Sequence, residues 1–317
     1  MRILVTGGAG FIGSYLTEQL IQKKHKVAIF DAYLNFTNNN LYYQKSLEIR
    51  KKYFKNNPPK TYLRDIRDLG ELEKAVEDFK PDVIVHLAGL PMARVPKNYS
   101  HLMLPINMQG TLNVLEVFEK SKARRFVFAS SSMAYGHFMQ TPQSEEFILK
   151  PINSYGATKA AGEYFVKLSK KEWVIARATS VYGFTDCANR VTQLLLDAAV
   201  LRKPAWVVRG ETLDFSYIED VIEGYLRCIL LPKAAGNTFN ISKGEARAAS
   251  EFAGILREYF PKFKFEIRKP DRHQVWRGPM DITKARKILK FNPKYSIEEG
   301  IEKTIKLIKK YNFYNLS

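Results

Sequence analysis

The sequence predicts an α/β fold with a doubly wound parallel sheet and a smaller mixed α/β lobe toward the C-terminus. Two observations support this fold class. Short apolar runs typical of buried strands alternate with segments of helical periodicity, and the first apolar run leads directly into a cluster of glycines. The chain has 317 residues, 45% of them hydrophobic and 26% charged, which is enough for a large core and ordinary for a globular protein.

The first predicted strand, residues 3–5, runs into Gly7, Gly10 and Gly13, and a helix-period segment follows at once. Glycines at this spacing allow a tight turn, a close approach of a pyrophosphate to the amides at the helix start, and close packing of the helix on the strand. A glycine turn without a ligand is the alternative. The strand, turn and helix in succession favour a dinucleotide site of the Rossmann type.

The second predicted strand, residues 26–30, ends in Asp31. An acid about 20 residues beyond such glycines accepts hydrogen bonds from a ribose 2′-hydroxyl and repels a 2′-phosphate. NAD is therefore favoured over NADP. Farther on, Asp65 and Ile66 are placed to flank an adenine, and the small residues at 87–89 suit close approach of a flat cofactor.

The alternation of strands and helices continues to about residue 183 and then loosens. Further strands are predicted at 62–67, 82–87, 125–129 and 173–177, with helices at 42–53, 69–79, 107–119 and 155–165. Beyond them, helices are predicted at 192–201, 220–230, 248–259, 282–289 and 297–311, and strands at 205–208, 214–218, 238–241 and 262–268. We expect an NAD-binding domain over residues 1–181, with 214–242 returning to it, and a substrate-binding lobe formed by 182–213 and 243–317.

The stretch from Ser130 to Lys159 is expected to hold the chemistry. Tyr155 and Lys159 are four residues apart, which on a helix places them on one face, roughly 6 Å apart along the axis. A lysine ammonium there would lower the pKa of the phenol from its usual value near 10. This spacing alone is a weak signal, because a packed tyrosine followed by an exposed lysine produces it too. The serines at 130–132 strengthen it, since they follow a strand at the edge where such sheets bind ligands.

Several other functions are disfavoured. The formal net charge is +18, but the lysines are spread over most predicted helices and no nucleic-acid-reading motif accompanies them. No apolar run approaches the ~20 residues that cross a bilayer, and no leader is recognised at the start. Cys187 and Cys228 form no close pair, and the histidines have no zinc-ligand spacing. We expect a cytoplasmic protein without nucleic acid, membrane or metal as a partner.

Taken together, the motifs resemble those of the extended short-chain dehydrogenase/reductase family, in particular the NAD-dependent epimerase/dehydratase group that acts on nucleotide sugars. The resemblance covers nearly the whole chain. It rests on the segments Thr6–Gly13, Asp65–Arg67, His86–Gly89, Ser130–Gly136, Val181–Gly183, Asp214–Phe215, Tyr217–Asp220 and Asp281–Ala285, together with Asp31, Tyr155 and Lys159.

This resemblance implies roles for individual residues. Tyr155 would take the proton of a sugar hydroxyl as hydride leaves the same carbon, Lys159 would bind the nicotinamide ribose, and Ser131 would hold the reacting hydroxyl and relay its proton. It also implies tightly bound NAD and a homodimer with a four-helix contact formed by the helices of Asn107 and Tyr155. The expected cofactor contacts are Gly7, Gly10, Phe11, Ile12, Gly13, Asp31, Asn35, Asp65, Ile66, Leu87, Ala88, Gly89, Asn107, Ser130, Tyr155 and Lys159.

Departures from the family pattern narrow the reaction. Relatives that dehydrate, decarboxylate or 3,5-epimerise the sugar have an acid or base where this chain has Met133, and one branch has aspartate at Ser132. A thioether has no proton to exchange, although His137 could supply a base from elsewhere. The leading hypothesis is a 4-epimerase that serves polysaccharide biosynthesis by transient oxidation at C4. The alternatives are a C4 dehydrogenase or 4-ketoreductase, and a non-catalytic NAD-binding regulator.

The substrate side departs from the pattern as well. Leu213 stands where many relatives have an arginine that grips the diphosphate, and Ser180 replaces a common asparagine. Other cations must then bind a nucleotide diphosphate. Arg190 is the first candidate, Arg277 the second and Arg94 the third, since a guanidinium suits bidentate phosphate contact. The expected substrate contacts are Ser131, Ser132, Ser180, Arg190 and Arg277.

Overall fold

The computed structural model describes residues 1–35, 40–54, 56–91, 101–271 and 274–315. Its centre is a sheet of seven parallel strands in the order β11-β6-β5-β4-β1-β2-β3. The strands are β1 (Arg2–Thr6), β2 (Lys26–Asp31), β3 (Lys60–Leu63), β4 (Val83–His86), β5 (Arg125–Ser131), β6 (Glu172–Ala178) and β11 (Asn237–Ile241). The order reverses between β1 and β4, so the crevice that binds ligands in such sheets opens there. The predicted doubly wound α/β fold is confirmed.

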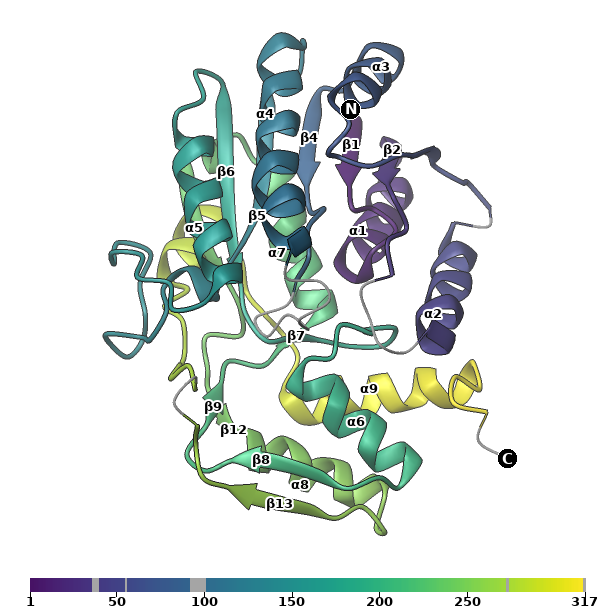
Figure 1. Ribbon diagram of the computed structural model, residues 1–317, viewed down its shortest axis with the longest axis vertical. Coiled ribbons are helices and arrows are strands. Elements are labelled where there is room, and N and C mark those ends of the chain that lie inside the picture. The colour runs from purple at the N-terminus through teal and green to yellow at the C-terminus, as the bar shows by residue number, and fades with distance from the viewer. Residues whose placement is uncertain (36–39, 55, 92–100, 272–273, 316–317) are drawn as a thin grey trace.

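Helices cover both faces of the sheet (Figure 1). They are α1 (Phe11–Gln22), α3 (Leu69–Phe79), α4 (Gly110–Lys120), α5 (Ser154–Lys167) and α7 (Ile218–Leu230), with a π-helical turn, η2 (Pro105–Gln109), leading into α4. Helix α2 (Asn40–Tyr53) lies to the side of the sheet and packs against α1. Strand side chains alternate between the faces. In β1, Ile3 and Val5 pack with α1 and α7, whereas Leu4 packs with α3 and α4.

Most of the remaining elements gather beyond the carboxyl ends of the strands (Figure 1). Their bounds are β7 (Val181–Tyr182), α6 (Val191–Leu201), β8 (Ala205–Val208), β9 (Thr212–Leu213), β10 (Ser216–Tyr217), β12 (Arg247–Ala248), α8 (Ala249–Tyr259), β13 (Phe265–Arg268) and α9 (Ile297–Lys310). The π-helical turn η5 (Ala285–Leu289) instead packs against α7 and β11. Strand β8 pairs in parallel with β13. Short 3₁₀ turns lie at Ser132–Ala134 (η3) and Pro232–Ala234 (η4). The division into two lobes stays a prediction; the observed fact is that β11 returns to the sheet beside β6.

Some predicted elements differ from the observed ones. The strand predicted at 214–218 is wrong: only Ser216 and Tyr217 form a short strand, and α7 already begins at Ile218. The reason is the buried Asp214, whose carboxylate accepts hydrogen bonds from the amides of Gly244 and Met280. These bonds hold the surrounding loops, and no strand pairing forms at Asp214. Burial raises the pKa of this carboxyl to about 7. Strand β5 extends two residues beyond its predicted end, to Ser131.

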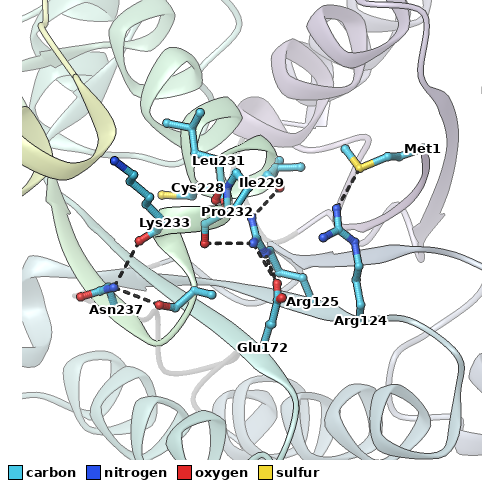
Figure 2. Close-up of polar contacts among 11 residues, drawn as sticks. Met1, Arg124, Arg125, Glu172, Cys228, Ile229, Leu231, Pro232, Lys233 and Asn237 are labelled. Atoms are coloured by element: carbon cyan, nitrogen blue, oxygen red, sulfur yellow. Dashed lines mark hydrogen bonds and ion pairs between the residues drawn. The ribbon is translucent and has the colours of Figure 1, made fainter.

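Helix α7 is anchored at its C-terminal end by Arg125, the first residue of β5 (Figure 2). The buried guanidinium donates to the carbonyl oxygens of Ile229 at 3.0 Å and Leu231 at 2.8 Å, and it pairs with Glu172. The last carbonyls of a helix have no partner within the helix, so this cation satisfies them and favours the negative end of the helix dipole. The position of α7 under the sheet is thereby fixed.

Candidate functional site

A cavity of about 950 Å³ opens at the carboxyl ends of the strands. One part of its wall is formed by the glycine turn, the end of β2 and the ends of β4, β5 and β6. The opposite part comes from α6, β8 and the segment around Arg277. Cavities of this size hold drug-sized or larger ligands. Most of the predicted site residues line this one cavity, and the described residues that do not are Asn35 and Asn107.

The backbone of the glycine turn lies so close to neighbouring backbone atoms that there is no room for side chains at two of its glycines. Gly7 has φ +72°, and a Cβ there would lie 2.6 Å from the amide nitrogen of Ala88; a Cβ at Gly13 would lie 2.1 Å from the carbonyl oxygen of Gly7. The turn therefore packs directly against the end of β4 and leaves the start of α1 open to the cavity. Amides at a helix start attract phosphate oxygens. This cradle fits a dinucleotide pyrophosphate.

Asp31 ends β2 at the cavity wall. Its carboxylate accepts the amides of Ala9 at 2.9 Å and Tyr33 at 2.8 Å, which hold it in place beside the glycine turn. Burial raises the pKa of this carboxyl, and the two amides and the Arg50 guanidinium oppose that change. Arg50, which the sequence did not indicate, ties α2 to the turn by donating to the carbonyl oxygens of Ala9 and Thr185.

Lys159 is buried on α5 and donates to the carbonyl oxygen of Ala129 on β5 at 2.8 Å. Its ammonium group also lies close to Gly89, since a Cβ on that glycine would be 3.8 Å away. Burial lowers the pKa of Lys159 to about 8, and the negative charge of Glu163 partly opposes the change. An ammonium has three donors, and this one lies at the cavity wall with a single protein acceptor among the described residues.

Tyr155 lies one turn before Lys159, as predicted, with the lysine nitrogen 5.9 Å from the centre of its ring. Burial raises the pKa of the Tyr155 phenol; the charge of Arg190 and the Ser131 hydroxyl act in the opposite direction. The sequence led us to expect that Lys159 lowers the pKa of Tyr155. In the protein without ligands, Lys159 is not among the groups that act on this pKa. Arg190, which also lines the cavity, is the cation that favours the phenolate.

The three serines after Ala129 have different partners. Ser130 donates to the buried Glu163, and Ser132 donates to Thr179 Oγ1 at 2.8 Å. The Ser131 oxygen accepts the amide of Met133 at 3.2 Å, and its hydroxyl hydrogen-bonds the Tyr155 side chain, which opposes the rise in the pKa of that phenol. Of the three, Ser131 is the one that acts on Tyr155.

A buried charge cluster supports this side of the cavity. Arg177 on β6 binds Glu163 with two hydrogen bonds, of 2.8 and 2.6 Å, and donates to the Tyr135 hydroxyl at 2.7 Å. Glu163 and Lys159 are one turn apart on α5 and bind consecutive residues of β5. The cluster therefore locks α5 against β5. The four-residue spacing of Tyr155, Lys159 and Glu163 is the signal that could have revealed it.

Three further residues that the sequence singled out lie in or near the cavity wall. Asn107 is buried outside the cavity and donates to Leu90 O and Thr158 Oγ1, which links the loop after β4 to α5. Asp65 lines the cavity, and its carboxylate pairs with Arg67. His86 lies in the core between two threonine hydroxyls, where burial lowers its pKa to about 3, so it is a neutral structural residue.

The substrate side of the cavity holds two candidate cations. Arg190 donates to Asp186 at 3.1 Å and lies 5.9 Å from the Phe11 ring. The buried Nε of Arg277 has no hydrogen-bond partner among the described residues, and burial lowers its pKa. Met133 lines the cavity, as does Ser180, which has φ +41°. Arg94 lies outside the described residues.

The carboxylates that line the described cavity are Asp31, Asp65, Asp186, Asp197 and Glu211, and none of them lies on β5, on α5 or in the segment between. His137 is not part of the cavity wall either; its Nδ1 accepts the amide of Trp276. Within the described ranges, no group of three or more His, Cys, Asp or Glu side chains is arranged to hold a metal ion. No helix there is both long and apolar enough to cross a membrane.

Known proteins share this architecture. Residues 4–304 match the model of the GDP-mannose 4,6 dehydratase family. The UDP-glucose epimerase YtcB of Bacillus subtilis, itself uncharacterised, is 30% identical over 321 residues, which cover 96% of this chain and 97% of that protein. A UDP-glucose 4-epimerase from Thermotoga maritima, solved with UDP-glucose, has a TM-score of 0.85 at 26% identity, and covers 98% of this chain and 99% of its own.

A second solved structure, the UDP-glucuronic acid 4-epimerase of Bacillus cereus with UDP-glucuronic acid and NAD, has the same TM-score of 0.85 at 26% identity. It covers 98% of this chain and 99% of its own. The family match spans nearly the whole chain and agrees with the glycine cradle, the serines of β5 and the Tyr155–Lys159 pair. The chain therefore belongs to the GDP-mannose 4,6 dehydratase family, within the extended short-chain dehydrogenases/reductases that act on nucleotide sugars.

Proposed function

We propose that this protein is an NAD-dependent nucleotide-sugar 4-epimerase. The observation that carries the proposal is the meeting of Ser131, Tyr155 and Lys159 at one end of the cavity, next to Met133. The first three are the groups that alcohol oxidation needs. The fourth is an inert thioether where dehydration would need an acid or a base. Chemistry confined to one carbon, C4, follows from this combination.

The proposed reaction begins with Tyr155 taking the proton of the sugar 4-hydroxyl, which Ser131 orients and whose proton it relays. When bound, NAD would supply the acceptor for the hydride that leaves C4 and the donor from which C4 regains it. The sugar becomes a 4-keto sugar, turns over, and regains hydride at C4 from the other face, while Tyr155 gives its proton back. Arg190 and the Ser131 hydroxyl favour the phenolate that this cycle requires. Because the hydride returns to C4 and the proton returns to the hydroxyl, no NAD is consumed.

Lys159 would bind the nicotinamide ribose with its unused donors. Asp31 would bind the adenosine ribose, and its carboxylate would repel a 2′-phosphate, so we propose NAD over NADP. The carboxylate is held by two backbone amides, which makes this contact rigid. Tight retention of NAD belongs to the same proposal.

For the diphosphate of the substrate we rank Arg277 before Arg190, the reverse of the order expected from sequence. Arg190 already binds Asp186, whereas the Arg277 Nε has no described partner. A buried N–H donor without an acceptor is costly, and a diphosphate oxygen would satisfy the Nε of Arg277. UDP is our first choice of nucleotide, because the relatives described above are named for UDP-sugars.

We also propose a homodimer formed through α4 and α5. The large apolar side chains Leu104, Tyr164 and Leu168, near or on these helices, are 65%, 59% and 77% exposed. A contact with the same helices of a second copy would cover them. Sedimentation tests this: Leu168→Glu should give monomers, and Leu63→Glu, at an exposed leucine on β3, should not. A monomeric wild-type protein would remove the proposal.

The functional test uses the full-length protein. Its bound cofactor is released and identified, and the protein is then incubated with UDP-, GDP-, dTDP- and ADP-sugars. Product stereochemistry is followed together with the absorbance of reduced cofactor. We expect inversion at C4 without net reduction, whereas a stoichiometric keto product would instead identify a C4 dehydrogenase. We place this activity in the cytoplasm, in the supply of sugars for polysaccharide biosynthesis; both cysteines are free thiols.

A further inference from the structure

Helix α7 carries a tyrosine whose side chain reaches the cavity from beneath the sheet. Tyr225 is only 1% exposed, yet it is part of the cavity wall. It packs in the core cluster on the face covered by α1 and α7. Ala129 of β5 and Ala178, the last residue of β6, belong to the same cluster and also line the cavity.

The Tyr225 hydroxyl is not among the described polar atoms that are sealed in the core without a partner, although Tyr225 as a whole is buried. A hydroxyl that lines a cavity and has no protein partner is free to bind water or a ligand. Burial raises the pKa of this phenol far above its ordinary value. It therefore stays neutral and can both donate and accept a hydrogen bond.

The position of Tyr225 indicates that its hydroxyl would contact the cofactor rather than the sugar. The glycine cradle at the start of α1 and Tyr225 on α7 lie on the same face of the sheet, and α1 packs against α7. Tyr155 is among the groups whose charge acts on the Tyr225 phenol, so the two side chains lie near each other. A dinucleotide that extends from this cradle toward Tyr155 would therefore end near Tyr225. The candidate diphosphate ligand, Arg277, lies instead on the wall formed by the C-terminal elements.

We propose that the Tyr225 hydroxyl binds the carboxamide of the nicotinamide ring and so sets which way the ring faces the sugar. A carboxamide offers one acceptor and two donors, which matches a neutral phenol that can do both. Because Arg125 holds the C-terminal end of α7, the hydroxyl is presented from a fixed helix. The inference rests on the NAD dependence proposed above and extends it to a residue that no motif indicated.

The test compares two ligands and two variants. Full-length protein freed of bound nucleotide is titrated with NAD and with ADP-ribose, which lacks the nicotinamide. Tyr225→Phe should bind NAD about three- to tenfold more weakly than wild type, the usual effect of one hydrogen bond, while its affinity for ADP-ribose stays within about twofold. Tyr217→Phe is the matched control. The Tyr217 hydroxyl is buried without a partner among the described residues, and it does not line the cavity.

Each outcome is decisive. Equal affinity of wild type and Tyr225→Phe for NAD overturns the inference and leaves the proposed function intact. An equal loss for NAD and ADP-ribose also overturns it, because the effect would then be a general disturbance of the fold. Wild-type protein that binds neither ligand would overturn the proposed NAD dependence itself. Circular dichroism of both variants checks that they are folded.

Discussion

Strand β5 has a buried cation at each end, and the two cations differ in how completely they are satisfied. At the amino end, Arg125 donates to several carbonyl oxygens of α7 and pairs with Glu172. At the carboxyl end, Lys159 donates to Ala129 O and faces the cavity with its remaining donors. A buried cation with all its donors used holds the fold together. One with donors left over is prepared for a ligand.

The same distinction separates two arginines farther along the chain. Arg177 has its guanidinium filled by Glu163, Tyr135 and a backbone carbonyl, and it lies in the core. Arg277 has a buried Nε without a partner among the described residues, and it lines the cavity. Arg177 is buried and Arg277 is partly exposed, so both exposure to the cavity and hydrogen-bond satisfaction distinguish the structural arginine from the candidate binding residue.

The largest effect is expected at the carboxyl end of β5. Tyr155→Phe removes the proton acceptor, and we expect turnover to fall by about 10²- to 10⁴-fold, or ~3–5 kcal/mol of barrier. NAD binding should change little, because the ring is kept. Tyr259→Phe, at an exposed tyrosine of α8, is the control. Steady-state rates and retained cofactor are the measurements, and unchanged turnover of Tyr155→Phe would refute the assigned role.

At the amino end the effect should be on stability. Arg125→Met leaves the last carbonyls of α7 without their donor, and we expect the free energy of unfolding to fall by about 2–4 kcal/mol. Its neighbour Arg124 has its Nη2 3.4 Å from Met1 Sδ at the surface (Figure 2), so Arg124→Gln should stay within ~0.5 kcal/mol of wild type. Denaturant titration measures both changes, and equal stability of the two variants would contradict the anchoring role.

These contacts also show what the sequence could and could not predict. The glycine turn, Asp31, the serines and the Tyr155–Lys159 pair were predictable because each is a short-range pattern tied to one strand end or one helix face. The Arg125–Ile229 contact joins residues 104 apart, and Glu163 with Arg177 joins a helix to the next strand. Such contacts depend on how elements pack, which no local period encodes. Tyr225 belongs to this second group.

We expect activity to depend on pH through Lys159, whose ammonium group has unused hydrogen-bond donors. The pKa of Lys159 is about 8 against an ordinary 10.5, so the ammonium that would bind the ribose is lost as pH rises through about 8. Activity should then fall by up to about tenfold per pH unit on the alkaline side. The contribution to stability has the opposite sign. Between about pH 8 and 10.5 the unfolded chain holds more protons, so the free energy of unfolding rises with pH.

Replacing the neighbouring acid sharpens this prediction. Glu163 raises the pKa of Lys159, so Glu163→Gln should move the alkaline limb of the pH–rate profile to lower pH. The variant also leaves the buried Arg177 without its carboxylate partner, which is destabilising, so the profile is recorded at a temperature where circular dichroism shows a folded protein. A limb that stays in place in the folded variant would mean that Lys159 does not control it.

The smallest effect is expected on the substrate side. Arg277→Gln keeps a hydrogen-bond donor but loses the charge, and KM for the nucleotide sugar should rise about fivefold, ~1 kcal/mol, with kcat nearly unchanged. Arg286→Gln, at an exposed arginine of η5, is the control and should leave KM as in wild type. If KM moves for Arg190→Gln and stays constant for Arg277→Gln, the diphosphate is bound by the arginine that already has a carboxylate partner. Whether an arginine already has hydrogen-bond partners would then not tell a substrate-binding arginine from a structural one in this cavity.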